Sequence, residues 1–439
     1  MRITTVAVTF ILAGFAMMPG ARIGAAAPAG YGDPAGKTNP LSSFALEPVS
    51  LFSAADIPEA EPGKPAWLPG KAWCYGIAYY DKWVYAVSRA EYILQFERDP
   101  ATAKLTYQGA TPFAGYHSDE KSPNIVCGIR RLNDGKAMLT ILDGNDSPGW
   151  WYPGDKGGFI WYSIDKETGK LTAAGKQVPA RFDKHNAQQL WAPDQQRFCI
   201  GGYGWTKIYW YRFAEDGAPV EDGSFTLKNW PNGNFPGSSV RLSPDWRHLY
   251  HLAFQWSEDP LCDKTPQIDT YEIDPKTNAE TCVSSLELPY VGTRKDHVSG
   301  AIEPVSPDGK HLYVIFEGGA TSYYYVLARD PNNGKLTIIH QGTEASLRVA
   351  VPWSRMDRLA FSSDGKSGYY ISGFDRLRGG PLGRFARDSA TGALTILPPV
   401  ADLAVQKLIV DPANGNMFTV GENISSFKIP APVSAAVAK

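Results

Sequence analysis

A short phrase recurs along nearly the whole chain, and it constrains the fold more than any other feature. Its clearest copy is residues 323–337, where an alternating run of tyrosines and aliphatic residues leads into Asp330-Pro331 and resumes after Gly334. Such alternation is typical of a half-buried strand. Proline fixes φ at one corner of a tight turn, and glycine accepts a positive φ at another. The phrase therefore predicts a strand, a turn and a second strand.

Copies of this phrase return at similar intervals. Successive turn aspartates lie between 51 (165 to 216) and 66 (99 to 165) residues apart. They are Asp99, Asp165, Asp216, Asp274, Asp330 and Asp388. A second turn phrase, Ser-Pro-Asp or a close variant, precedes several of them, at Asp194, Asp245, Asp308 and Asp364. Each unit thus contains four short strands and two repeated turns.

Such a unit is typical of a β-propeller, and little helical periodicity is found after the first residues. We predict an all-β, seven-bladed β-propeller with four-stranded antiparallel blades within residues 68–430. The predicted blades are 73–114, 122–181, 185–232, 237–290, 297–345, 351–400, and 402–429 completed by 44–52. Six or eight blades, and a β-sandwich or solenoid, stay open as alternatives.

The last repeat contains only three predicted strands. A ring of blades must hide the edges of its first and last sheets. Residues 44–52 have strand character and lie within a Pro-, Ala- and Gly-rich lead-in, residues 27–67. We predict that residues 44–52 supply the missing outermost strand and close the ring. Residues 431–439 are predicted to be a disordered tail.

Residues 1–26 have the pattern of a secretory signal peptide. Arg2 precedes an apolar run, residues 6–18, that is too short for a membrane span, and small residues follow. We predict a secreted or periplasmic monomer without a membrane span after signal removal; a retained anchor is the alternative. Removal of Arg2 and Arg22 takes the net charge from −2 to −4 (−2 − 2), which disfavours nucleic acid as a partner.

Five cysteines follow the signal segment, so at least one thiol is left unpaired in an oxidising compartment. Cys262 and Cys282 fall in one predicted blade and are the expected disulfide. Cys199 lies in the middle of a predicted strand and is expected to be a small buried residue. No cysteine or histidine spacing indicates zinc, and residues 143–147 lack the ligand spacing of a calcium loop. We expect no metal and no cofactor.

Propeller topology places both repeated turns on one face, which we call the turn face. Irregular loops then occupy the opposite face, which we call the loop face, and function usually resides on loops held by a rigid scaffold. Loops before innermost strands contain Arg181, His185, Arg294, His297, Trp353 and Arg355; loops inside blades contain Trp150, Trp205 and Trp256. These are the predicted site residues. A structural histidine, a solvated arginine and a tryptophan covering a blade are the plainer interpretations.

The repeated phrases resemble those of the seven-bladed lactonase family, the 6-phosphogluconolactonase-like propellers. The resemblance covers most of residues 73–429 and is best around residues 306–337 and 362–395. It implies lactone hydrolysis, with a histidine in the third blade and an Arg-His pair and a later Glu in the fourth. Here His185 lies two residues before the third-blade position, Gly237-Ser238-Ser239-Val240 occupies the Arg-His position, and the Glu position falls near Phe254.

Two classes of function follow from these patterns. The first is an exported lactonase-like enzyme that binds an anionic small molecule, such as a sugar lactone, at the mouth of the central channel. His185 or His297 would act as general base, and Arg355 with Arg181 or Arg294 would stabilise a carboxylate and the developing oxyanion. The second is a non-catalytic propeller that binds a protein or a glycan through its aromatic loop face. A redox-enzyme subunit is a third possibility.

Overall fold

The computed structural model describes the strands and repeated turns of the chain, all within the compact unit Phe44–Lys439; Met1–Ser43 form a separate unit outside this description. The described residues are 46–67, 76–87, 90, 92–113, 125–132, 135–142, 158–174, 178–179, 187–192, 196–202, 207–215, 217–227, 236–255, 265–274, 277–278, 280–289, 299–318, 321–344, 359–371, 380–411, 413 and 415–429. The predicted signal peptide and tail therefore lie outside them.

Five antiparallel sheets follow one another along the chain, each built mainly from consecutive strands. The first contains β4 (Gly76–Tyr80), β5 (Trp83–Val87), β6 (Tyr92–Arg98) and β7 (Leu105–Pro112). The second contains β8 (Ile125–Leu132), β9 (Lys136–Leu142), β10 (Gly158–Ile164), β11 (Leu171–Ala173) and β12 (Val178–Pro179). The third contains β13 (Ala187–Trp191), β14 (Arg197–Gly202), β15 (Lys207–Phe213) and β16 (Pro219–Thr226).

The fourth and fifth sheets repeat this order. The fourth contains β17 (Pro236–Leu242), β18 (His248–Gln255), β19 (Gln267–Ile273) and β20 (Glu280–Glu287). The fifth contains β21 (Ser299–Ile302), β22 (His311–Gly318), β23 (Thr321–Arg329) and β24 (Leu336–Glu344). In each of these two sheets the first strand lies at one edge and the last strand at the other. The predicted four-stranded antiparallel unit is therefore observed.

A larger sheet of seven strands ends the chain, in the order β1-β30-β29-β28-β27-β26-β25. Its later strands are β25 (Leu359–Phe361), β26 (Ser367–Ile371), β27 (Gly380–Arg387), β28 (Leu394–Asp411), β29 (Asn416–Gly421) and β30 (Ile424–Lys428). The first part of β28 pairs with β27, and its last part pairs with β29. We call this assembly the large sheet. Two repeats predicted as separate are thus joined through one long strand.

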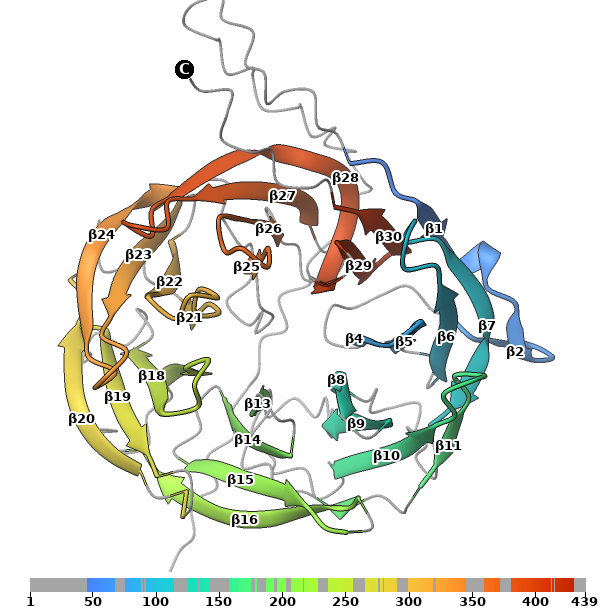
Figure 1. Cartoon of the computed structure of the whole chain (residues 1–439), viewed down its shortest axis with the longest axis horizontal. Helices are drawn as coiled ribbons and strands as arrows, with labels where there is room; N and C mark the ends of the chain where they lie inside the picture. The colour runs from blue at the N-terminus through green and yellow to red at the C-terminus, as the bar shows by residue number, and fades with distance from the viewer. Residues whose placement is uncertain are drawn as a thin grey trace, which may run out of the picture. The chain divides into compact units, whose positions relative to one another are not determined.

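Successive sheets pack face to face through their apolar side chains. Buried clusters join the first sheet to the second, the third to the fourth, the fourth to the fifth, and the fifth to the large sheet. Phe159 of the second sheet packs edge-on against Phe198 of the third. Within Phe44–Lys439 the sheets follow one another around a central axis, with β4, β8, β13, β21 and β25 among the strands nearest to it (Figure 1). The fold is a β-propeller.

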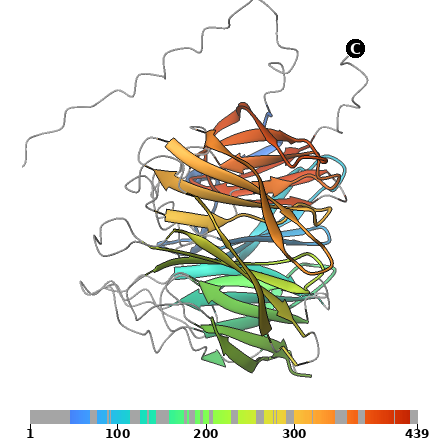
Figure 2. The same cartoon turned by 90° about the vertical axis from the view of Figure 1, so that its left-hand side faces the viewer.

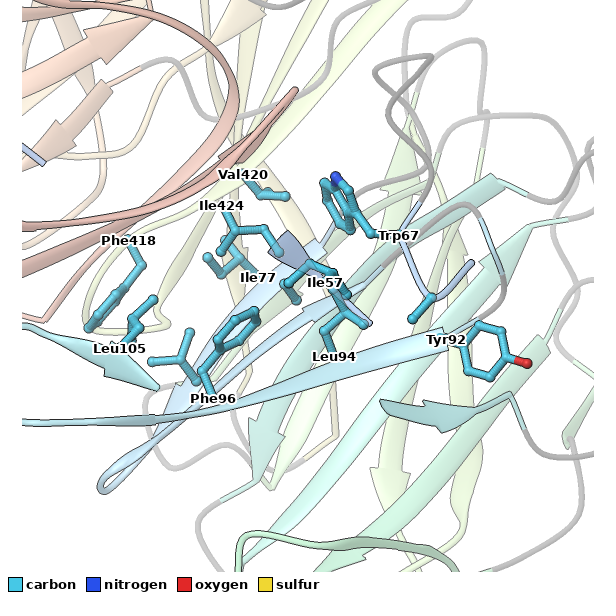
Figure 3. Close-up of a cluster of buried hydrophobic side chains, with 13 residues drawn as sticks. Ile57, Trp67, Ile77, Tyr92, Leu94, Phe96, Leu105, Phe418, Val420 and Ile424 are labelled. Carbon is cyan, nitrogen blue, oxygen red and sulfur yellow. The ribbon is translucent and has the colours of Figure 1, made fainter. Parts of the chain in front are cut away.

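The large sheet also packs against the first sheet. Phe418, Val420 and Ile424 of the large sheet share a buried cluster with Ile77 and Phe96 of the first sheet (Figure 3). Side chains separated by more than 300 residues in sequence are therefore in one core. The two ends of the repeat array meet at this boundary.

The lead-in contributes to the same boundary. β1 (Ser50–Phe52) pairs antiparallel with β30, so that Ser50 lies opposite Ser426. The Ser50 hydroxyl accepts a hydrogen bond from the backbone N–H of Leu105 in the first sheet at 2.8 Å. The observed strand is shorter than the predicted 44–52, because residues 46–49 are irregular and 44–45 lie outside the described residues.

A short 3-10 turn (Ala54–Asp56) and a small hairpin follow β1, and the sequence had not indicated either. The hairpin contains β2 (Glu59–Glu61) and β3 (Lys64–Pro65). Trp67 after the hairpin is 1% exposed and belongs to the cluster between the large sheet and the first sheet (Figure 3). Among the described residues, no helix has the length and apolarity needed to cross a bilayer.

The repeated turns have the predicted chemistry. Gly334 and Gly392 both adopt φ +70°, a conformation that glycine accepts most readily. The N–H of Gly334 donates to the carbonyl of Asp330 at 2.8 Å, and the Asp330 carboxylate accepts from the N–H of Asn332 at 2.8 Å. Arg247, in the other turn phrase, donates to the carbonyl of Asn332 at 3.3 Å. Both turn phrases therefore lie on one face, and the coloured turns gather on one side in Figure 2.

Candidate functional site

The residues predicted for the site all lie outside the described part of the chain. They are His185, His297, Arg355, Arg181, Arg294, Trp353, Trp150, Trp205 and Trp256. In sequence, His185 is two residues before β13 and His297 is two residues before β21. The described strands show the scaffold that supports the loop face. The placement of these nine side chains stays a prediction.

The innermost strands of neighbouring sheets are fastened to one another by polar side chains. The Ser239 hydroxyl on β17 accepts from the N–H of Ile302 on β21 at 3.1 Å. Arg241, also on β17, donates through Nε and Nη2 to the Ile302 carbonyl at 3.2 and 2.8 Å. Side chains of β17 thus bind both the backbone N–H and the backbone carbonyl of Ile302 on β21. This holds the innermost strands of the fourth and fifth sheets in register.

A carboxylate makes the next connection around the axis. Glu303 directly follows β21 and is fully buried. Its Oε2 accepts from the N–H of Leu359, the first residue of β25, at 3.2 Å. A backbone N–H that begins an edge strand is thereby satisfied. Side chains therefore connect the innermost strands of the fourth, fifth and large sheets to one another.

Ser239 occupies the region where the lactonase resemblance implies an Arg-His pair. Its hydroxyl accepts the N–H of Ile302, and its side chain is buried. The role that the structure gives Ser239 is therefore to join two innermost strands.

A buried histidine and aspartate lie side by side in the fourth sheet. His251 on β18 is paired with Asp269 on β19, and both are 1% exposed or less. Asp269 Oδ1 accepts from Gln267 Nε2 and from the Ser285 hydroxyl, each at 2.5 Å. The second carboxylate oxygen and both ring nitrogens of His251 have no hydrogen-bond partner among the described residues.

Burial keeps this histidine neutral. Burial lowers the pKa of His251 to about 4, and the Asp269 carboxylate opposes that shift. The pair faces the third sheet, because Leu249 and Tyr271, two residues away along each strand, contact that sheet. A side chain that is 1% exposed does not contact a ligand in the channel. In the sequence, His251 is a polar residue at a position of the strand where the alternating pattern places buried apolar residues. That mismatch could have indicated a buried histidine.

A second unusual carboxyl group lies at the boundary of the third and fourth sheets. Trp210 donates its indole N–H to Glu280, and burial raises the pKa of Glu280 to about 7 despite that bond. Burial also raises the pKa of the nearby Cys199 thiol, with a smaller contribution from the Glu280 charge. Cys199 is buried and its thiol is free, as expected from the sequence.

The expected disulfide joins Cys282 to Cys262, which lies outside the described residues. Cys282 is half-buried, and its sulfur lies 3.9 Å from the carbonyl of Ser284. The pairing stays a prediction. Over the described ranges, no group of three or more His, Cys, Asp or Glu side chains is placed to hold a metal ion.

The turn face is occupied by contacts between sheets. Arg329 binds Asp245 on the neighbouring sheet, Arg387 binds Asp308, and Arg98 binds Asp411. These pairs give Asp245, Asp308 and Asp411 a structural role. The loop face, where the innermost strands begin, is therefore the better candidate for function.

The chain was compared with known proteins. No sequence-family model matches it, and no curated protein matches it. A chain of a mitotic checkpoint complex has a TM-score of 0.51 at 12% identity, covering 88% of this chain and 97% of that one. At this identity the likeness shows a shared fold alone.

Two further structures are similar to the chain at lower scores. A periplasmic gluconolactonase from Pseudomonas aeruginosa has a TM-score of 0.48 at 16% identity, covering 77% of this chain and 92% of its own. A putative 6-phosphogluconolactonase from Bacteroides uniformis has a TM-score of 0.47 at 16% identity, covering 75% and 84%.

Proposed function

We propose that the protein is an exported, lactonase-like propeller. It binds an anionic small molecule, such as a sugar lactone, at the mouth of the central channel on the loop face, and it hydrolyses that ligand. The observation that carries the proposal is a difference between the turn face and the loop face. The described arginines and aspartates of the turn phrases bind neighbouring sheets, whereas the innermost strands begin on the opposite face, next to loops rich in His, Arg and Trp.

The chemistry assigned to these loops is simple. His185 or His297 is the general base that activates water, because a histidine near its ordinary pKa accepts a proton at neutral pH. Arg355, with Arg181 or Arg294, binds a carboxylate and the oxyanion, because a guanidinium offers paired donors to two oxygens. Trp353 would form an apolar wall of the site. No metal or cofactor is needed for this reaction.

The architecture that supports this site is proposed in the same terms. The ring has seven blades, and residues 44–52 close it. The pairing of β1 with β30 and the buried cluster between the large sheet and the first sheet support closure. The two repeats joined through β28 are counted as the sixth and seventh blades.

The test compares binding and hydrolysis in matched variants. We expect His297→Ala and Arg355→Ala to weaken binding of an aldonate at least tenfold and to abolish lactone hydrolysis, with little change in thermal stability. The controls are His340→Ala, which removes an exposed histidine on β24, and Arg212→Ala, which removes a half-exposed arginine on β15. Isothermal titration and a pH-stat assay with glucono-lactone measure the two effects. Equal activity in all four variants would overturn the enzyme proposal.

A non-catalytic propeller is the second candidate. The observation that favours it is Ser239, whose hydroxyl joins two strands at the place where the lactonase resemblance implies catalytic residues. The ligand would then be a neutral glycan or a protein, bound through Trp150, Trp205 and Trp256. A thermal-shift screen that finds only such ligands, with normal binding by the Arg355→Ala variant, would select this candidate.

Export and monomeric state are part of the proposal and have direct tests. Amino-terminal sequencing of the protein recovered from the periplasm or the medium should begin near residue 27. Light scattering of that protein should give a mass slightly below the 48.0 kDa of the full chain. An intact amino terminus retained in the membrane fraction would support the anchor instead.

A further inference from the structure

The fourth and fifth sheets are joined by an arrangement of four side chains on the turn face. Arg329, the last residue of β23, donates from Nη2 to both carboxylate oxygens of Asp245, at 3.0 and 2.8 Å. The same nitrogen lies 3.1 Å from Nδ1 of His248, and Nε donates to the Tyr250 hydroxyl at 2.7 Å. The Arg329 side chain is 2% exposed. We call this arrangement the first latch.

The fifth sheet and the large sheet are joined in the same way. Arg387, the last residue of β27, donates from Nη2 to both oxygens of Asp308, at 3.0 and 2.9 Å. Nη2 lies 2.5 Å from Nδ1 of His311, and Nε donates to the Tyr313 hydroxyl at 2.9 Å. The aspartate, histidine and tyrosine have the same sequence spacing as in the first latch. We call this the second latch, and the fifth sheet lies between the two.

The geometry fixes the protonation state of both histidines. A guanidinium has five N–H donors, no acceptor, and a permanent positive charge. Nδ1 of His248 and of His311 must therefore accept, and the ring proton must be on Nε2. A protonated imidazole has an N–H on both nitrogens. It would place a donor and a positive charge against the arginine, so each latch requires a neutral histidine.

The rings are also held in place from the other side. A Cβ on Gly334 would lie 2.3 Å from Cδ2 of His248, and a Cβ on Gly392 would lie 2.5 Å from Cδ2 of His311. Each ring is thus packed between an arginine and the backbone of the next turn. A protonated ring has little room to turn away from the guanidinium while the turn stays in place.

We propose that the two latches form an acid-sensitive clamp on the fifth sheet, which opens at both of its boundaries when His248 and His311 are protonated. Each histidine faces charges of both signs. Those around His248 are Arg329, Arg247, Asp245 and Glu272, and those around His311 are Arg387, Lys310, Asp308 and Asp388. The clamp goes beyond the proposed function and does not depend on it.

The direction of the pH effect follows from the surroundings of the rings. Burial, and then the adjacent arginine, lower the pKa of both histidines below 6.5. The folded protein therefore binds these protons less readily than the unfolded chain does. The stabilisation by the latches is complete above about pH 6.5 and is lost as the pH falls below that value. Asp308 stays charged in this window, because its hydrogen bonds outweigh burial and lower its pKa to about 2.

A boundary without histidine provides an internal reference. Arg98 of the first sheet binds Asp411 of the large sheet, and its guanidinium lies 5.0 Å from the ring centre of Tyr79 and 5.6 Å from that of Phe418. In the part of the chain that the structure describes, no histidine contacts Arg98. This boundary should be insensitive to mild acid.

The experiment is hydrogen–deuterium exchange with mass spectrometry between about pH 7.5 and 5.5, corrected for the intrinsic pH dependence of exchange. The reporting amides are those of Arg329 and Arg387, which donate to the carbonyls of Lys310 and Lys366 at 2.7 Å. We expect their protection to fall at least several-fold at the lower pH. The amide of Arg98, which donates to the Lys82 carbonyl at 2.7 Å, should keep its protection.

The matched variant is the double change His248→Asn and His311→Asn. An asparagine oxygen accepts a hydrogen bond from arginine near the position of Nδ1 and does not titrate. This variant should keep its protection at both boundaries at the lower pH. The control His340→Asn removes an exposed histidine and should respond to acid like the wild type. His251 is present in all of these proteins, so their differences do not report on it.

A second measurement keeps the proposal testable if the double variant does not fold. Nitrogen-15 NMR of the wild-type histidines should show protons on Nε2 of His248 and His311 at neutral pH and titration below the ordinary range. The proposal is overturned if either ring carries its proton on Nδ1 or titrates near pH 6.5 (the model-peptide value). It is also overturned if protection at Arg98 falls as much as at Arg329 and Arg387, or if protection does not fall.

Discussion

Buried arginines form ion pairs between neighbouring sheets. Arg98, Arg329 and Arg387 each end the third strand of a repeat. Arg329 and Arg387 bind an aspartate of the preceding repeat, and Arg98 binds Asp411 of the large sheet. An arginine that is almost fully buried needs such a partner, because a buried unpaired charge costs several kcal/mol. Removing the aspartate of such a pair would therefore leave an uncompensated buried arginine and destabilise the fold.

Glu280 gives a prediction with a defined pH dependence. Burial raises its pKa from 4.5 to about 7, so the folded state binds this proton more readily than the unfolded chain. Stability from Glu280 is therefore complete at low pH and is lost as the pH rises through about 7. Glu280→Gln should remove that loss and raise the free energy of unfolding at about pH 8 by roughly 1–2 kcal/mol, a value reduced because the side chain is partly exposed.

Urea denaturation at about pH 6 and pH 8 measures this effect. Glu272→Gln is the control, because Glu272 is exposed and lies at the same end of the fourth sheet. A Glu280→Gln variant whose stability falls with pH as steeply as that of the wild type would show that Glu280 is ionised at neutral pH.

Gly392 gives a second prediction at this scale. Its φ of +70° strains any residue with a Cβ, and that Cβ would meet the His311 ring at 2.5 Å. Gly63 has a similar φ of +76° with nothing within 4 Å of the Cβ position. Gly63→Ala should therefore cost about 1 kcal/mol from the backbone alone, and Gly392→Ala about 1–2 kcal/mol more. Chemical denaturation compares the two; equal losses would mean that the His311 ring moves aside at no cost.

At the scale of strands and turns, the sequence predicted the repeated turns from the backbone preferences of individual residues. Asp330, Pro331 and Gly334 each have a backbone requirement that is visible in sequence, and the turn formed as predicted. The hairpin at residues 59–65 was missed because a Pro-rich lead-in has no alternating pattern. The sequence predicted a boundary between the last two repeats near residue 401, whereas β28 runs through that position as one continuous strand, Leu394–Asp411.

Contacts between distant elements were beyond sequence reasoning. His248 and Arg329 are 81 residues apart, and the phrase that contains His248 is fully explained as a turn, so nothing local marked its partner. The loops that carry His185, His297 and Arg355 have no repeated pattern at all. Strand periodicity therefore located the scaffold of the site, while the arrangement of side chains on its irregular loops could be assigned only by resemblance and by topology.

Replacement of Trp67 tests how much the residue that follows the hairpin contributes to the free energy of unfolding. The side chain is 1% exposed and packs in the cluster between the large sheet and the first sheet. Trp67→Ala should lower the free energy of unfolding by about 3–5 kcal/mol, as expected for a large buried aromatic residue. Leu51→Ala on β1 is the control, because Leu51 is 47% exposed and should cost less than about 0.5 kcal/mol. Comparable losses in the two variants would show that Trp67 is not buried in solution.

At the scale of the whole molecule, the first sheet and the large sheet share a buried cluster. Most sheets are covered on both faces by neighbours that are also close in sequence. The first sheet and the large sheet are the exception, because Phe418 and Ile77 share one buried cluster although they are far apart in sequence. We propose that this contact closes the ring, which would make stability cooperative around it, in contrast to an open array of repeats.

Closure by the lead-in is the last prediction. β1 supplies an outer strand to β30, Ser50 binds the N–H of Leu105, and Phe52 packs against Phe96 with ring centres 5.1 Å apart. Deletion of residues 28–55 would expose the edge of β30 and remove contacts to both ends of the repeat array. We expect a fall of about 10 °C or more in the melting temperature of the mature protein, together with concentration-dependent association through the exposed edge. Deletion of residues 431–439 is the control and should leave the melting curve unchanged. Calorimetry and light scattering measure the two effects, and a melting temperature unaffected by loss of residues 28–55 would mean that the ring closes without its amino-terminal strand.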